Sequence, residues 1–130
     1  MDKNKGGTVL LVVAHGSRRE SSNEEVRALA QQIQTLEGCN FTAVNAAFLE
    51  LAEPSIPDGV SQSLESGADR VLVMPYFLSR GRHVVEDIPA ELDKARAKHP
   101  DAEIELCGYL GGHGAIPQLL LTMAREHGAG

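Results

Sequence analysis

The sequence predicts an α/β fold in which a four-stranded parallel sheet carries helices on both faces. Two observations lead to this prediction: short runs rich in β-branched residues alternate with segments of helical periodicity, and each predicted strand is followed by a predicted helix. A chain of 130 residues with 42% apolar residues can bury one core, so we expect a single domain over 1–130, with its core at about 8–127.

Four apolar runs have the length and composition of buried strands. In chain order they are TVLLVVA at 8–14, FTAVNAAF at 41–48, DRVLVMPY at 69–76 and AEIELCG at 102–108. Because a helical segment follows each run, we expect parallel pairing with right-handed crossovers, which places helices on both faces of the sheet.

The first helix is expected from about 20 to 37, ending at Gly38; the apolar residues of its predicted buried face are Val26, Leu29, Ile33 and Leu36. A weaker helix is expected at 54–66.

Val84, Ile88, Leu92 and Ala95 share one face of a third helix. Pro89 delays its regular hydrogen bonding to about Asp87, and Pro100 ends it. The last helix is expected at 116–126, where the apolar side chains outnumber those that one buried stripe needs.

Composition excludes several classes of function. A net charge of −6 argues against nucleic acid or an anionic membrane surface as a partner, and no run approaches the length of a membrane span. The apolar run near the start has no credible cleavage site, so we expect a cytoplasmic protein. Cys39 and Cys107 form no CxxC pair and are expected as free thiols. Neither GxGxxG nor GxxxxGK[ST] occurs, so we expect no nucleotide.

Three polar residues follow three of the predicted strands. His15 comes directly after the first, Glu50 two residues after the second, and His83 a few residues after the third. Ligands of parallel sheets bind beyond the carboxyl ends of the strands, so all three side chains are expected at the binding edge. Alone, each residue is more often a structural or solvated group. Together, two imidazoles and a carboxylate suit a divalent metal ion with proton transfer beside it.

The motifs that hold these residues resemble the small CbiX-type sirohydrochlorin chelatases. They are LLVVAHGSRRESSNEEV at 10–26, AFLELAEPSI at 47–56, MPYFLSRGRHVVEDIP at 74–89 and YLGG at 109–112, in this order. The resemblance covers about 9–125 and is specific as a combination. It implies a flavodoxin-like chelatase domain, ATP-independent insertion of cobalt or iron into sirohydrochlorin, metal binding by His15 and His83, and a nearby acidic role for Glu50.

Neighbouring residues are expected to support this chemistry. Arg18, Arg19, Arg80 and Arg82 flank the two histidines and are either clamps for the carboxylates of sirohydrochlorin or solvated arginines. Ser17 is expected near the substrate as a loop residue with donors to offer. Asp87 lies four residues after His83 and either orients its imidazole or caps the following helix.

The same residues leave partners and metal partly open. Cobalt, iron and nickel all accept imidazole and carboxylate ligands, so Co²⁺, Fe²⁺ and Ni²⁺ remain possible substrates. Relatives of double length contain two such domains around a cleft, which implies that this chain forms a homodimer around a sirohydrochlorin-type tetrapyrrole. A non-catalytic tetrapyrrole or metal carrier is the alternative. A phosphate-binding module would need a phosphate-cradling glycine loop, which VAHGS does not offer.

Overall fold

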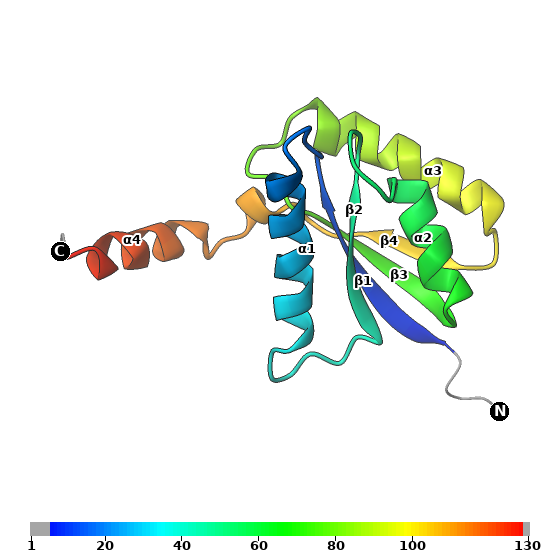
Figure 1. The fold of residues 1–130 in the computed structure, drawn as a ribbon, viewed down its shortest axis with the longest axis horizontal. Helices are drawn as coiled ribbons and strands as arrows, with labels where there is room; N and C mark the ends of the chain where they lie inside the picture. The colour runs from blue at the N-terminus through cyan, green and yellow to red at the C-terminus, as the bar shows by residue number, and fades with distance from the viewer. Residues whose placement is uncertain (1–5, 129–130) are drawn as a thin grey trace.

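The computed structural model describes residues 6–128, which contain a four-stranded parallel sheet (Figure 1). The strands are β1 (Gly7–Ala14), β2 (Ala43–Phe48), β3 (Ala68–Pro75) and β4 (Glu103–Leu106), in the spatial order β2-β1-β3-β4. This confirms the predicted fold class. Residues 1–5 and 129–130 lie outside the described range, and the domain bounds of 1–130 stay a prediction.

Four α-helices alternate with the strands, as predicted. They are α1 (Glu20–Gln34), α2 (Ile56–Glu65), α3 (Ile88–Lys98) and α4 (Ile116–Glu126). Two shorter turns also occur within residues 6–128: a π-helical turn at His83–Asp87 and a 3₁₀ turn at Leu110–Gly112.

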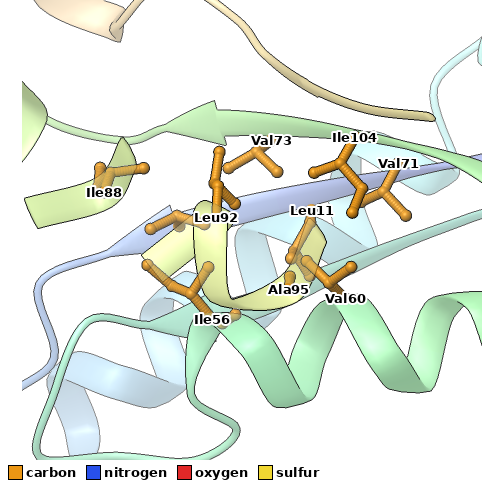
Figure 2. Packing of buried hydrophobic residues seen from close by; sticks show 11 residues of the cluster. Leu11, Ile56, Val60, Val71, Val73, Ile88, Leu92, Ala95 and Ile104 are labelled. Carbon is orange, nitrogen blue, oxygen red and sulfur yellow. The ribbon is translucent and has the colours of Figure 1, made fainter. Parts of the chain in front are cut away.

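One face of the sheet is covered by α2 and α3, which bury the larger apolar cluster (Figure 2). Leu92 and Ala95 of α3, which the periodicity placed on the buried face, are fully buried there. Ser55 is the N-cap of α2, because its hydroxyl accepts a hydrogen bond from the Asp58 N–H. This layer holds the first turn of α3, and therefore the segment that carries His83.

The opposite face is covered by α1, which packs on β2 and β1. The prediction for this helix was partly wrong. It ends at Gln34 rather than near residue 37, and Leu36 is 61% exposed. The buried residues are Asn23, Val26 and Ala30, so the face that meets the sheet is rotated away from the predicted stripe. The rotation places the polar Asn23 inside, where periodicity in apolar residues could not detect it.

The last helix, α4, lies apart from the sheet (Figure 1). None of its residues is buried, and Leu119, Leu120, Leu121 and Met123 are all exposed. Its bounds agree with the sequence prediction. The apolar side chains of α4 are therefore not buried within its own domain.

No helix among the described residues is long and apolar enough to cross a membrane. Cys39 and Cys107 are both free thiols, as expected.

Candidate functional site

His15 and Glu50 are held side by side by the backbone. β1 and β2 pair in parallel up to Ala14 and Phe48, and the pairing continues beyond them. Ala14 O accepts from Leu49 N at 2.9 Å, and His15 O accepts from Glu50 N at 3.0 Å. The side chains then meet, with His15 Nε2 3.2 Å from Glu50 Oε2. Both side chains remain about half exposed at 41% and 56%.

This approach depends on Gly16. Gly16 has a φ of +96°, a conformation that favours glycine. A Cβ at this position would lie 1.7 Å from the Glu50 carbonyl oxygen. The glycine of the HGS motif thus lets the loop after β2 contact the loop after β1.

The His15 ring is oriented by its neighbouring backbone. Nδ1 lies 3.0 Å from the Gly16 carbonyl oxygen. A carbonyl oxygen can only accept, so the Nδ1 atom carries the hydrogen. Nε2, the atom that faces Glu50, is therefore either an acceptor or the second donor of an imidazolium. Two acceptors that face each other at 3.2 Å require a positive charge between them, which a proton or a metal ion can supply.

His83 is the first residue of the π-helical turn. Pro89 lacks an N–H for the Val85 carbonyl, and Ile88 N bonds His83 O instead, which widens the turn. Within this turn, His83 Nδ1 lies 2.8 Å from Asp87 Oδ2. A carboxylate accepts the Nδ1 hydrogen and leaves His83 Nε2 with its lone pair.

The structure thereby separates the two interpretations of Asp87. Asp87 precedes α3, yet its side chain makes no capping hydrogen bond to the helix. Its backbone is already helical, with φ −72° and ψ −43°, whereas a capping residue is usually extended. The interpretation as a helix cap is wrong, and the carboxylate instead contacts His83.

The two imidazoles lie close together at the carboxyl edge of the sheet. Their ring centroids are 4.7 Å apart, with an angle of 67° between the ring planes. His15 and His83 follow β1 and β3, the neighbouring strands at which the strand order reverses. The Phe77 ring lies 6.5 Å from His83. Within residues 6–128, no three His, Cys, Asp or Glu side chains form a group that could hold a metal ion.

Four arginines flank the two histidines in the sequence. Arg18, Arg19, Arg80 and Arg82 are all exposed. Arg82 Nε lies 3.9 Å from Glu86 Oε1, and among residues 6–128 no ion pair joins the other three arginines to an acidic side chain. Their guanidinium groups can therefore reach an anion in solvent.

The loop after His15 is fastened by a residue that sequence reasoning missed. The buried side chain of Asn23 accepts from Ser17 N at 3.0 Å and donates to Ser17 O at 2.8 Å. Ser17 Oγ in turn accepts from Arg19 N at 2.9 Å. The signal was an asparagine one turn into a predicted helix, directly after the HGSRRESS segment.

Asn23 also donates to the Glu20 carboxylate, which Arg27 contacts at 2.7 Å. The hydrogen bond from Arg27, followed by that from Asn23, lowers the pKa of Glu20 below its ordinary value of 4.5.

Comparison with known proteins points to one family. A family model described as CbiX matches residues 9–127. The chain is similar to the chloroplastic sirohydrochlorin ferrochelatase of Arabidopsis thaliana, with 36% identity over 107 residues, 82% of this chain and 47% of that protein. The chain spans about half the length of the curated relatives it matches.

Solved structures with the same fold agree. The crystal structure of a CbiX protein from Marinobacter aquaeolei VT8 has a TM-score of 0.75 at 30% identity, covering 92% of this chain and 96% of that chain. The sirohydrochlorin chelatase SirB from Bacillus subtilis subspecies spizizenii, solved in complex with cobalt, has a TM-score of 0.81 at 25% identity. That match covers 92% of this chain and 50% of that chain.

Proposed function

The chain belongs to the CbiX family, and we propose that it inserts a divalent metal ion, Co²⁺ or Fe²⁺, into sirohydrochlorin without ATP. The observation that carries the proposal is the contact between His15 Nε2 and Glu50 Oε2 at 3.2 Å, with the second imidazole alongside. An iron chelatase and a cobalt-bound chelatase among its relatives support the choice of metals.

In this proposal His15 and His83 bind the metal through Nε2. The Nδ1 atom of each ring is already occupied, by the Gly16 carbonyl in one case and by Asp87 in the other. A carboxylate behind a ligating imidazole fixes its tautomer and raises its basicity. Glu50, whose oxygen faces His15 Nε2, is the proposed third donor; the described side chains do not yet converge as a group of three, so metal binding is expected to draw them together.

The site must also release its metal. A closed four-ligand cage keeps an ion, whereas a chelatase has to transfer it to the macrocycle. Side chains that are about half exposed leave one side of the ion open to the substrate. As the metal enters, the macrocycle loses two pyrrole protons, and the Glu50 carboxylate or a freed imidazole nitrogen accepts them.

The exposed arginines Arg18, Arg19, Arg80 and Arg82 pair with carboxylates of sirohydrochlorin in this proposal. A guanidinium binds a carboxylate through two parallel hydrogen bonds, which suits a substrate with carboxylates around its rim. Ser17 contributes through its hydroxyl hydrogen, since its oxygen already accepts from Arg19 N. The chain's charge of −6 makes such local cations necessary for an anionic substrate.

We propose further that two copies form a homodimer in the cytoplasm. The edge of one sheet forms an open surface, which covers only one side of a ligand, whereas small-molecule sites usually bury 70–90% or more of a ligand of drug size. The same surface of a second copy, facing the first, encloses a flat macrocycle. Two longer relatives, the Arabidopsis ferrochelatase and the cobalt-bound SirB, are matched over 47% and 50% of their lengths, which leaves room for a second such surface within one chain. The two free thiols fit a reducing compartment.

The test is anaerobic incubation with sirohydrochlorin and Co²⁺ or Fe²⁺, followed by absorbance. His15→Ala and His83→Ala are expected to reduce the insertion rate by more than about 100-fold. Asp87→Asn is expected to reduce it by about 10- to 100-fold, since it acts through His83. His99→Gln is the matched control, because His99 follows the last residue of α3 and bonds Ser61 instead.

Unchanged insertion in the variant that lacks both His15 and His83 contradicts the assignment of the site. A wild-type chain that binds metal and sirohydrochlorin but never joins them contradicts the enzymatic proposal and indicates a carrier.

A further inference from the structure

The helix α4 lacks a packing surface within its own domain. All eleven of its residues are unburied, and it extends away from the sheet (Figure 1). An isolated helix shorter than about 12–15 residues is only marginally stable in water, and helices in proteins are stabilised mainly by packing of an apolar face. The folded helix therefore needs a surface that its own domain does not provide.

The side chains of α4 are arranged for such a surface. Ile116, Leu119, Leu120 and Met123 follow the spacing of three and four that defines one helical stripe. At about 100° per residue, Leu121 lies about 150° from the centre of this stripe, on the other side of the helix. The charged residues Arg125 and Glu126 occur only at its end. The stripe therefore offers one apolar side of the helix for packing against another surface.

The sheet offers such a surface on the face that α1 covers. α1 packs mainly on β2 and β1, and α2 and α3 lie on the other face of the sheet, so the β3–β4 half of this face is less covered. Leu72 and Met74 lie there and are partly buried. Three charged side chains also lie on this half, where Arg70 is 2.8 Å from Glu105 and 3.9 Å from Glu103. The β3–β4 half thus provides an apolar strip at Leu72 and Met74 toward the carboxyl edge, bordered by α1 and by the charges around Arg70.

An apolar hollow continues this surface toward the carboxyl edge. It has a volume of about 480 Å³ and is lined by Met74, Cys107, Gly108, Tyr109, Leu110, Gly112 and His113. Burial already raises the pKa of the Cys107 thiol. Gly111 N, in the chain that leads to α4, bonds Phe77 O at 2.9 Å. The hollow therefore adjoins the segment that leads from β3 to His83.

We propose that α4 of one copy packs on the β3–β4 half of the α1-side face of a second copy, and that the exchange is reciprocal. This names the element that forms the homodimer proposed above and rests on that proposal. An eleven-residue helix is about 16 Å long, which fits along β3, whose eight residues span about 26 Å.

A second copy is the occupant because the surfaces are self-complementary. Each chain contributes one unpacked apolar helix and one less covered half-face, so a two-fold exchange covers both at once. The stripe brings no charged side chain, and Arg70 stays paired with Glu105 beneath it. Covering a chain's own half-face would instead require α4 to fold back through the short connection at 113–115.

The first test places charges on the helix. Leu119→Glu combined with Met123→Glu puts two carboxylates on the stripe, and Gln118→Glu combined with Thr122→Glu puts the same charge on the opposite side. The wild type and the control pair are expected at twice 13.9 kDa by light scattering, and the stripe variant at 13.9 kDa. Because α4 buries nothing in its own domain, the stripe variant keeps its fold, as circular dichroism will report.

Alkylation of the two native thiols gives a second readout in the same chains. We expect Cys107 to react at least about tenfold faster in the stripe variant than in the wild type, a change of about 1.4 kcal/mol, while Cys39 stays constant. Equal Cys107 rates in wild type and stripe variant overturn the proposal.

Cross-linking separates exchange from folding back. In a Leu120→Cys variant, mild oxidation is expected to join position 120 to Cys107 of the second copy and to give a covalent dimer on a denaturing gel. Thr122→Cys, on the opposite side of the helix, is the control. A bridge within a monomer, or no bridge at all, overturns the exchange.

Insertion activity is measured separately. A cross-linked dimer without insertion activity leaves the exchange standing and removes the proposed function. A wild-type chain that is monomeric and fully active overturns the exchange and leaves the proposed function standing.

Discussion

Replacing Gly16 by alanine tests whether the contact between His15 and Glu50 depends on the close approach of two loops. The added methyl carbon would lie 1.7 Å from the Glu50 carbonyl oxygen, whereas atoms in van der Waals contact lie about 3.5 Å apart. The loop after β2 must therefore retreat by roughly 2 Å. That shift breaks a side-chain contact of 3.2 Å.

The magnitude follows from two costs. A left-handed backbone costs a residue with a Cβ about 1–2 kcal/mol, and overpacking costs about 1–3 kcal/mol. The free energy of unfolding is therefore expected to fall by about 2–5 kcal/mol. The affinity for Co²⁺ is expected to fall by about tenfold or more, as for loss of a residue that supports a metal ligand.

Gly81→Ala is the matched control, because a Cβ at Gly81 meets nothing within 4 Å and the residue has no positive φ. Its free energy of unfolding is expected to change by less than about 0.5 kcal/mol. Denaturant unfolding measures the stability, and titration calorimetry with Co²⁺ measures the affinity. If the two alanine variants matched in both measurements, the role given to Gly16 would be refuted.

Two further predictions concern the scaffold. Leu92→Ala is expected to cost about 2–5 kcal/mol in denaturant unfolding because it opens a cavity where α3 meets the sheet; Leu36→Ala, at a position 61% exposed, should be near neutral. Arg27 lowers the pKa of Glu20, so the Glu20 carboxylate stabilises the fold above its ordinary pKa of 4.5 and loses this contribution as pH falls through the lower folded value. Glu20→Gln should therefore show a shallower loss of Tm in acid, and identical acid profiles would contradict the pairing.

The local sequence pattern was sufficient to predict the helices and strands of this fold. The strand cores and the buried residues Ile88, Leu92 and Ala95 of α3 lie where the periodicity placed them. The edge shared by His15, Glu50 and His83 also followed from the chain alone, because parallel strands end on the same side. Periodicity and strand direction are local properties, and a sequence displays them directly.

Tertiary structure decided what depends on contacts between distant segments. The choice of Asp87 as a partner of His83 rather than a cap, the clamp from Asn23 to Ser17, and the approach permitted by Gly16 all arise from how the backbone segments meet. The separation of α4 from its own sheet is of the same kind. An amphipathic pattern requires that a helix be covered, but only the path of the chain determines which surface covers it.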